Sequence, residues 1–339
     1  MKTYDLRSDT ITRPTEGMRK AMYDAEVGDD VYAEDPSVNK LQDVAAEITG
    51  KEAALFVSSG TMGNLIPIYL LCGRGNELIA HRRAHILHYE MAAVSAIAGS
   101  MPVAVEGERG IIKPETIEPV IRPIVYSMPR TKLVEIENSH NVEGGTCYAK
   151  SDLEGVSTVA KKHGLLVHMD GARLFNAALA TGLTAKEICS HTDTVTFCLS
   201  KGLGAPVGSL LCGEKEIITE ARRVRKILGG AMRQAGVIAS AGLYALENNI
   251  ERLTEDHENA RLIADALIKI DWALLGPVET NIVYFSTPGR NAASVREALV
   301  QKGVLCNATG PDRIRMVTNL EISRTDTKEV CKIIAGLKV

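Results

Sequence analysis

The sequence lacks the features of nucleic-acid-binding proteins and membrane proteins. Aromatic residues make up 4% of its 339 residues, which leaves little material for a platform that stacks bases. Positive and negative charges nearly cancel, with 39 Lys and Arg against 42 Asp and Glu, and this balance excludes a strongly basic binding surface. The longest apolar runs fall short of the ~18 residues that a membrane span requires. We therefore expect no nucleic-acid partner and no membrane partner.

The start of the chain and its cysteines favour a cytoplasmic protein. The first ten residues, MKTYDLRSDT, contain no apolar stretch of the kind found in signal peptides. The seven cysteines include no Cys-x-x-Cys pair, so buried free thiols explain them better than a disulfide framework or a zinc site. His81, His85 and His88 are spaced at i, i+4 and i+7, but no Glu motif accompanies them, and we expect no metal site.

Most of the chain has the pattern of an α/β protein, and its length suggests about two domains. Helical periodicity at residues 15–25 and 36–49 comes first. Apolar runs then predict strands at residues 53–57, 77–80, 101–105, 133–137, 165–169, 194–199 and 207–212. Helical stretches lie between these strands, at residues 63–71, 90–96, 114–120, 150–163 and 184–189. This alternation predicts a mostly parallel sheet covered by helices, with ligands at the carboxyl ends of the strands.

The pattern changes after Cys212. Residues 214–228 and 232–270 have the periodicity of two long helices, separated by Gly229 and Gly230. Strands near 281–285 and 313–317, with helices near 292–302 and 325–337, then predict a small α+β domain. We place the boundary inside the second long helix. Residues 1–250 form a large domain that includes the N-terminal segment, and residues 251–339 form a small C-terminal domain.

The strongest chemical signal is the segment LLVHMDGAR at residues 165–173. An apolar strand ends in Asp170, which is followed by Gly171 and Arg173. A carboxylate at the carboxyl end of a strand points into the ligand cleft, where it can hold a protonated ring nitrogen. The alternative is a helix N-cap, because Asp is favoured there and residues 174–180 have a helical pattern. The segment alone leaves both interpretations open.

A lysine closes a second strand. Lys201 follows the apolar run 194–199 and precedes a turn with Gly202 and Gly204. A partly desolvated lysine has a lowered pKa and is suited to Schiff-base formation, whereas the ordinary alternative is a side chain turned to water. With Asp170, this lysine supplies the two groups that pyridoxal phosphate demands. The glycines miss the G-x-G-x-x-G spacing and no P-loop motif occurs, so a nucleotide-binding turn is excluded.

Other segments could hold the remaining parts of such a ligand. Residues 53–64 run from a strand through Gly60 and Thr61 into a helix, a pattern typical of a phosphate site and also of a plain capped helix. His85 follows the strand 77–80 and is placed to lie over a cofactor ring. Arg315 alternates with apolar residues in a strand, so its guanidinium is a candidate to bind a carboxylate.

Three further polar clusters have simpler interpretations. Asn138 and His140 follow the strand 133–137 and belong either to the cleft or to a surface loop. The acidic residues of 29–35 predict a solvated loop rather than a cation site. The basic residues of 222–226 predict the solvated face of a helix.

Eight segments together resemble the L-threonine aldolase family of fold-type-I pyridoxal-phosphate enzymes. They run in the family's order across almost the whole chain, and they are specific only as a set. The segments are DLRSDT (5–10), GDDVY (28–32), SGTMGN (59–64), ENSHN (137–141), HMDGAR (168–173), LSKGL (199–203), MRQAG (232–236) and IRMVT (314–318).

The resemblance implies pyridoxal 5'-phosphate as cofactor and assigns its contacts. Lys201 forms the Schiff base with the cofactor. Asp170 pairs with the ring nitrogen, and His85 stacks on the ring. Gly60 and Thr61 hold the phosphate.

The resemblance also implies an oligomer and a substrate clamp. The family is usually a tetramer built from two dimers, in which the counterpart of Arg233 reaches the phosphate of a neighbouring subunit. Ser8, Arg173 and Arg315 bind the substrate carboxylate or lie beside the cofactor oxygen.

The chain departs from the family pattern at two positions. The family usually has a His near the substrate hydroxyl where this sequence has Ser127, which leaves the preference between threonine and allo-threonine open. Asn319 also stands where a His is expected, at a position that we place outside the chemistry.

The activity implied by the resemblance is cleavage of L-threonine, L-allo-threonine and related β-hydroxy-α-amino acids to glycine and an aldehyde. His85 is the candidate for the base that takes the β-hydroxyl proton, directly or through water. A β-eliminating lyase, an aminotransferase or a transaldolase on the same fold is the alternative. An inert scaffold protein is disfavoured because Lys201 and Asp170 are both present.

Overall fold

The computed structural model describes residues 2–338. Its centre is a seven-stranded sheet in the order β2-β8-β7-β6-β5-β3-β4. Neighbouring strands pair in parallel, except that β8 is antiparallel to both β2 and β7. The strands are β2 (Ala53–Val57), β3 (Glu77–His81), β4 (Met101–Val105), β5 (Thr131–Glu137), β6 (Leu166–Asp170), β7 (Thr194–Cys198) and β8 (Ser209–Gly213). The predicted α/β fold with a mostly parallel sheet is therefore confirmed.

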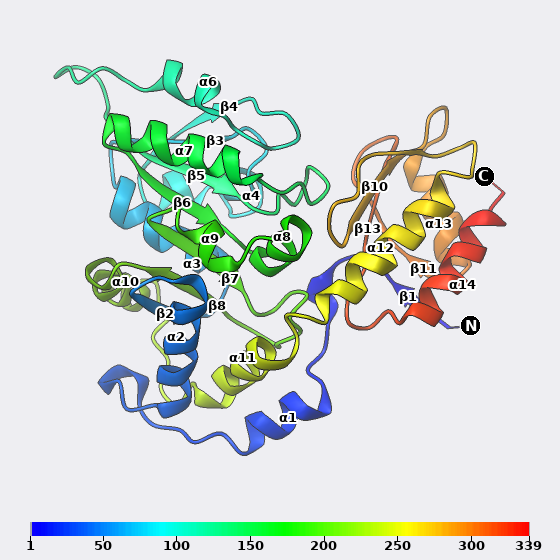
Figure 1. Ribbon diagram of the computed structural model, residues 1–339, viewed down its shortest axis with the longest axis horizontal. Coiled ribbons are helices and arrows are strands. Elements are labelled where there is room, and N and C mark those ends of the chain that lie inside the picture. The colour runs from blue at the N-terminus through cyan, green and yellow to red at the C-terminus, as the bar shows by residue number, and fades with distance from the viewer. Residues whose placement is uncertain (1, 339) are drawn as a thin grey trace.

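Helices cover both faces of this sheet (Figure 1). The first face packs against α2 (Pro36–Thr49), α7 (Lys150–His163), α8 (Leu174–Thr181) and α9 (Ala185–Cys189). The second face packs against α3 (Gly60–Pro67), a π-helical turn (Ile68–Cys72), α4 (His85–His88), α5 (Ala93–Ala96) and α10 (Lys215–Ile227). Two more helices, α1 (Glu16–Tyr23) and α11 (Gly236–Asn248), pack against each other, and α11 also packs against α2. The short helix α6 (Pro114–Ile117) contacts α7.

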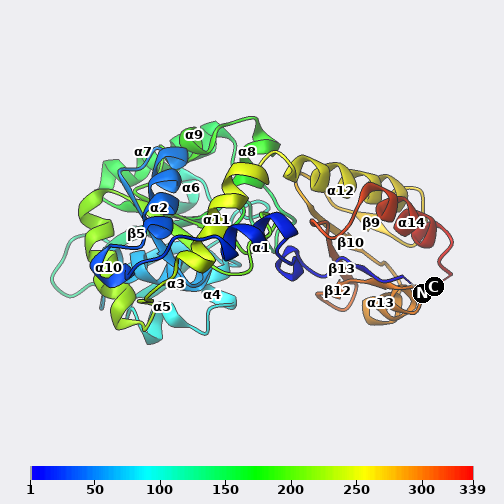
Figure 2. The ribbon, with the colours of Figure 1, turned by 90° about the horizontal axis from the view of Figure 1, so that it is seen from below.

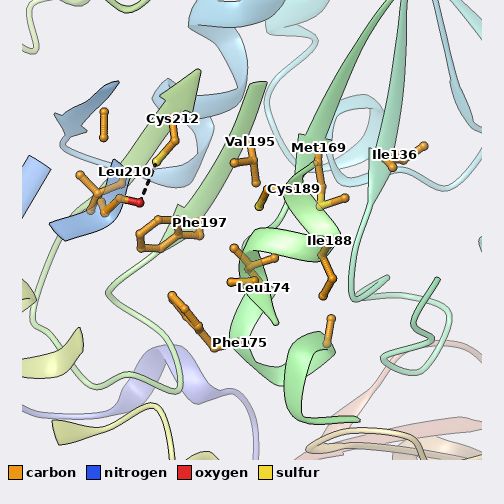
Figure 3. Packing of buried hydrophobic residues seen from close by; sticks show 14 of the residues in the cluster. Ile136, Met169, Leu174, Phe175, Ile188, Cys189, Val195, Phe197, Leu210 and Cys212 are labelled. Carbon is orange, nitrogen blue, oxygen red and sulfur yellow. Dashed lines mark hydrogen bonds between the residues drawn. The ribbon is translucent and has the colours of Figure 1, made fainter. Parts of the chain in front are cut away.

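Burial on both faces explains why the strands are nearly continuous apolar runs in the sequence. In β2, Phe56 faces the first set of helices, whereas Leu55 and Val57 face α10. Figure 3 shows the packing on the first face, where side chains of α8 and α9 meet those of β6, β7 and β8. The rings of Phe175 and Phe197 lie 5.3 Å apart, edge to face.

The C-terminal part has a sheet of its own (Figure 2). It also has a separate hydrophobic cluster. Its four strands are antiparallel in the order β12-β13-β10-β9, with the bounds β9 (Leu274–Leu275), β10 (Ile282–Ser286), β12 (Asn307–Ala308) and β13 (Arg313–Val317). Three helices belong to it, namely α12 (Leu253–Leu267), α13 (Ala292–Gln301) and α14 (Arg324–Ala335).

The beginning of the chain packs with this C-terminal part. Strand β1 (Tyr4–Asp5) pairs in parallel with β11 (Val304–Leu305). Tyr4 and Leu6 belong to the same hydrophobic cluster as α12, α13 and α14. The division into residues 1–250 and 251–339 stays a prediction.

The predicted helix over residues 232–270 is wrong, because two helices, α11 and α12, occupy this region. Oδ2 of Asp35 accepts a hydrogen bond from the backbone N–H of Gly236 at 2.8 Å, so α11 begins at Gly236. Asn249 and Arg252 lie between the two helices, and their side chains donate to backbone carbonyls of residues 202 and 203. These partners are distant in sequence, and helical periodicity therefore gives no sign of the break.

Two predictions of solvated charge are wrong in part: Glu34, Arg223 and Lys226 are exposed as expected, but Asp30, Asp35 and Arg225 are buried. Asp30 and Arg225 are both 1% exposed and form an ion pair of 2.5 Å between the loop 28–36 and α10. Arg225 also donates to the carbonyl of Phe56 at 2.7 Å. Asp35 is fully buried and accepts hydrogen bonds from Val38 and Gly236 at the starts of α2 and α11. These charges are removed from water because each has a partner elsewhere in the fold.

None of the helices within residues 2–338 has the length and apolar character of a membrane span.

Candidate active site

The carboxyl ends of β5, β6 and β7 meet the first turn of α3 at one edge of the central sheet. Asp170, the last residue of β6, is in register with Glu137 of β5 and Thr196 of β7. A Cβ atom added to Gly63 would lie 2.4 Å from Cγ2 of Thr196, so α3 packs directly on β7. Lys201 lies in the turn that follows β7. The structure thus brings the predicted anion site of α3 to the strand ends where sequence analysis placed the carboxylate and the lysine.

Asp170 is a buried carboxylate held by two donors. Nδ2 of Asn64 donates to Oδ2 at 2.9 Å, and the backbone N–H of Ala172 donates to Oδ1 at 3.0 Å. Burial raises the pKa of Asp170. The charges of His85 and Lys201 and the hydrogen bonds lower it by more, so the net pKa is lowered. The N-cap of α8 is Arg173, so the N-cap interpretation of Asp170 is wrong. The residue instead carries a negative charge at the site.

A buried hydrogen-bond network surrounds Asn64, and no motif in the sequence indicates it. Besides Asp170, the amide of Asn64 contacts Oε1 of Glu90 at 2.9 Å and Nε2 of His168 at 3.2 Å. Nδ1 of His168 contacts Oγ1 of Thr194 at 3.0 Å. Burial lowers the pKa of His168 to about 4, so its imidazole is neutral. Asn64 and His168 both lie in the quoted motifs, but no pattern in the sequence assigned a role to either.

His85 lies at the start of α4 and is tied to two carboxylates. Its backbone N–H donates to Oε2 of Glu137 at 2.9 Å, and its Nδ1 contacts Oε1 of Glu90 at 2.8 Å. Burial lowers the pKa of His85, whereas the hydrogen bond to Glu90 and the charges of Asp170 and Glu137 raise it, and the net pKa is raised. Burial raises the pKa of Glu90. One side-chain nitrogen or oxygen atom from each of His85, Glu90 and Asp170 lies within 4.8 Å of those of the other two. The charges of these three groups therefore affect one another.

Side chains from two distant segments hold the turn that carries Lys201. Oγ1 of Thr12 donates to the carbonyl of Lys201 at 3.1 Å. Arg252 donates to the carbonyl of Gly202 at 3.4 Å, and Asn249 donates to that of Leu203 at 2.7 Å. Three successive carbonyls are therefore fixed, two of them by the junction between α11 and α12 that sequence analysis missed.

Two arginines meet on the other side of the site. Asp9 accepts two hydrogen bonds of 2.7 Å from Arg173 and is fully buried. Oδ1 of Asn141 accepts from Arg173 at 3.2 Å and from Arg315 at 2.6 Å. Arg315 also donates to the carbonyl of Arg7 at 3.4 Å, and burial together with the charge of Arg173 lowers the pKa of Arg315. Sequence analysis assigned no role to Asp9 or Asn141.

Other candidates have different neighbours. Asn138 accepts a hydrogen bond from the N–H of Tyr148 at 3.3 Å, and His140 contacts His81 at 3.0 Å, so both are buried and neither lies in a surface loop. Ser8 caps the short helix of residues 9–11, next to Asp9.

Arg233 pairs with Asp29 at 3.1 Å, and its side chain is 58% exposed. Asn319 donates to the carbonyls of Asp5 and Ser8 at 3.1 and 3.4 Å and so fastens the N-terminal segment. Ser127 lies in an exposed turn between α6 and β5.

The residues fit pyridoxal phosphate as a ligand. Asp170 provides the buried negative charge that a protonated ring nitrogen requires, and Lys201 lies close enough to affect its pKa. Ser59 caps α3, whose first turn contains Gly60 and Thr61 and presents backbone N–H groups to an anion. A Cβ atom added to Gly60 would lie 2.9 Å from Sγ of Cys198, so this turn needs a glycine to lie so close to the end of β7.

Comparisons with known proteins identify relatives over almost the whole chain. The profile of the beta-eliminating lyase family matches residues 5–288. The chain is 45% identical to a probable low-specificity L-threonine aldolase 2 of Arabidopsis thaliana, over 97% of this chain and 96% of the relative. It is 42% identical to the low specificity L-threonine aldolase of Escherichia coli K12, over 96% of both. The structure of a threonine aldolase from Leishmania major superposes with a TM-score of 0.85 at 22% identity, over 98% of both chains.

The family profile covers most of the chain, and the relatives match almost its full length at more than 40% identity. The fold is shared with a solved threonine aldolase as well. The chain therefore belongs to the low-specificity L-threonine aldolases of the beta-eliminating lyase family.

Proposed function

We propose that this protein is a pyridoxal-phosphate-dependent aldolase that cleaves L-threonine and L-allo-threonine to glycine and acetaldehyde. The observation that carries the proposal is the buried carboxylate of Asp170, which is held by Asn64 and Ala172 and influenced by Lys201 and His85. Bound pyridoxal phosphate supplies an electron sink for the electron pair left when the Cα–Cβ bond breaks. The chain's own residues bind, orient and move protons around it.

The cofactor would be bound by Lys201, Asp170 and Arg173 together with the first turn of α3. Lys201 would hold its aldehyde covalently, and the carboxylate of Asp170 would keep the ring nitrogen protonated. Gly60 and Thr61 bind the phosphate at the start of α3. Arg173, which is fixed by Asp9, would hold the ring oxygen of the cofactor.

Arg315 is the main ligand of the substrate carboxylate. Two nitrogens of Arg173 are engaged by the carboxylate of Asp9, whereas within residues 2–338 the acceptors of Arg315 are the neutral oxygens of Asn141 and Arg7. Nε of Arg315 is buried and lacks a hydrogen-bond partner among residues 2–338. Such a guanidinium retains the charge and the donors to bind a carboxylate. Ser8 lies beside this clamp, and His85 takes the β-hydroxyl proton.

The active enzyme is a cytoplasmic homotetramer, a dimer of dimers, in which Arg233 binds the phosphate of a neighbouring subunit. The exposure of Arg233 supports this role, because a half-exposed guanidinium is available to a second chain. Light scattering measures the mass of the assembly, which should be that of four chains. Mixing an Arg233→Ala chain with a Lys201→Ala chain should restore activity if sites are shared between subunits, and a mixture as inactive as its parents would contradict the sharing.

Product analysis tests the reaction. Purified protein loaded with pyridoxal phosphate is mixed with L-threonine and with L-allo-threonine, and glycine and acetaldehyde are expected in equal amounts. Lys201→Ala should abolish both turnover and the visible absorbance of the bound cofactor. The ratio of the two rates measures the stereochemical preference at the position where Ser127 replaces a His. Ammonia with a keto acid would instead identify a β-eliminating lyase.

A further inference from the structure

Glu90 contacts the imidazole of His85 and was assigned no role by any motif. It follows α4 and is 3% exposed. Its Oε1 lies 2.8 Å from Nδ1 of His85 and 2.9 Å from Nδ2 of Asn64. Because a carboxylate oxygen only accepts, the hydrogen of the first contact is carried by Nδ1. Nε2 of His85, which has no hydrogen-bond partner among residues 2–338, is then the nitrogen that can receive a proton.

Asn64 fixes Glu90 relative to Asp170. Its Nδ2 donates to both carboxylates at 2.9 Å, and its Oδ1 faces Nε2 of His168 at 3.2 Å. The orientation of the amide follows from these partners, because two carboxylates require donors and a neutral His168 donates from Nε2. A buried network in which every member is satisfied holds one geometry. The position of Glu90 is thereby coupled to that of the residue that pairs with the cofactor ring.

Three carboxylates affect His85, and they come from different elements. Glu90 follows α4, Glu137 ends β5 and Asp170 ends β6. The contact of Glu137 is with the backbone N–H of His85, and the hydrogen bonds of Asp170 are to Asn64 and Ala172. The ring of Tyr89 lies 5.4 Å from that of His85. The charge of Lys201 lowers the pKa of Asp170, one of the three carboxylates. Of the three carboxylates, Glu90 alone hydrogen-bonds to the imidazole.

We propose that Glu90 is a positioning residue that holds the imidazole of His85 through Nδ1, so that Nε2 receives the β-hydroxyl proton of the substrate. This inference rests on the aldolase function proposed above. Asn64 supports Glu90 by keeping it at a fixed separation from Asp170. The hydrogen bond to Glu90 would then orient the imidazole of His85 towards a bound cofactor.

The charge and the geometry of Glu90 can be separated with two variants. Glu90→Gln keeps an acceptor for Nδ1 but removes the charge that raises the pKa of His85. We expect the acidic limb of the kcat/KM profile to move to lower pH and kcat to fall roughly tenfold, because the base is weaker. Glu90→Asp keeps the charge but draws it back from the ring, so kcat should fall while the acidic limb stays near its wild-type position.

A titration that needs no substrate gives the second measurement. The ¹³C signals of the histidine rings are followed against pH in the holoenzyme, and the signal of His85 is identified by its loss in His85→Asn. Its midpoint should lie at lower pH in Glu90→Gln than in the wild type. Glu143→Gln is the matched control, because it removes a carboxylate that pairs with Arg83 at 2.7 Å, and it should leave the midpoint unchanged.

An unchanged midpoint of His85 in Glu90→Gln, with kcat within twofold of the wild type, would overturn the proposal. If Glu90→Gln does not fold, Glu90→Asp tests the same contact, and an undiminished kcat in that variant would also overturn it. A shifted midpoint in a protein that does not cleave threonine would contradict the proposed function and leave the coupling between Glu90 and His85 intact.

Discussion

Three carboxylates, Glu90, Glu137 and Asp170, form one side of the candidate site, and two guanidinium groups form the other. On the acidic side, the donors to the carboxylates include an amide, backbone N–H groups and His85. On the basic side, Arg173 and Arg315 share one oxygen of Asn141. A bound cofactor ring with a protonated nitrogen would be cationic, and an α-amino acid substrate would bring a carboxylate. The two sides are complementary to these two ends.

The two sides also differ in how they are assembled. The acidic side comes from β5, β6, α3 and the segment after α4, which all belong to the central sheet and its helices. The basic side combines Arg173, which follows β6, with Asp9 from the N-terminal segment and Arg315 from the C-terminal sheet. The acidic side is thus set by one sheet, whereas the basic side depends on how the two parts of the molecule pack. Substitutions on the two sides should therefore have different kinetic effects.

Asp170→Asn should have the largest effect. It keeps the shape of the side chain but removes the charge that complements a protonated ring nitrogen. We expect kcat for threonine to fall by roughly a thousandfold, as for the loss of a preorganised electrostatic contact. Steady-state assays of glycine formation measure the effect, and the absorbance of the bound cofactor shows whether loading is retained. A loss of less than tenfold in a loaded protein would show that the acidic side does not act through this charge.

Arg315→Lys tests the basic side. A lysine keeps the charge but loses the planar fork that binds a carboxylate with two parallel hydrogen bonds. We expect KM for threonine to rise about tenfold, since a hydrogen bond to a charged group contributes about 1.5–3 kcal/mol, while kcat changes less. Arg313→Lys is the control, because Arg313 lies on the same strand and packs over the ring of Tyr284. Equal changes in KM for the two variants would contradict the assignment of the carboxylate to Arg315.

Asn249→Leu tests the turn that carries Lys201 between the two sides. The substitution leaves the carbonyl of Leu203 without its donor, which should lower the free energy of unfolding by about 1–3 kcal/mol and weaken retention of pyridoxal phosphate. Urea unfolding and cofactor titration measure the two effects. Asn248→Leu is the matched control, because the exposed Asn248 donates to the carbonyl of Tyr244 within its own helix. If both variants lose stability equally, the contact with the turn is not what matters at residue 249.

Sequence analysis predicted the parts of the site that depend on local order. Asp170 and Lys201 each follow an apolar run, and the end of a buried parallel strand is recognisable from a few residues. Asp9 and Arg173 are 164 residues apart, and Asn64 and Asp170 are 106 apart, so no local pattern relates them. The break at Asn249 was missed for the same reason, since its carbonyl partner lies 46 residues earlier. Strand positions were predictable because burial on both faces leaves a continuous apolar signal, whereas polar networks leave none.

Glu135→Leu should have the smallest effect. It compares the three hydrogen-bonded carboxylates of the acidic side with a buried carboxyl group that has no hydrogen bond within residues 2–338. Glu135 is fully buried on β5, and neither of its oxygens has a hydrogen-bond partner within the described chain. Burial and the charges of Asp170, Glu137 and Glu90 raise the pKa of Glu135 well above its ordinary value. The folded protein therefore binds this proton more tightly than the unfolded chain does, and the wild type loses stability as the pH rises above about 4.5 towards the raised pKa. Leucine removes this penalty, so the variant should gain about 1 kcal/mol at neutral pH and less below pH 4.5. Thermal unfolding at both pH values measures the difference. Glu135→Gln does not titrate, so it should remove the contribution of this residue to the pH dependence of stability while keeping a buried polar group. A variant less stable than the wild type at neutral pH would show that Glu135 has a partner in solution and that the acidic side uses a fourth carboxyl group.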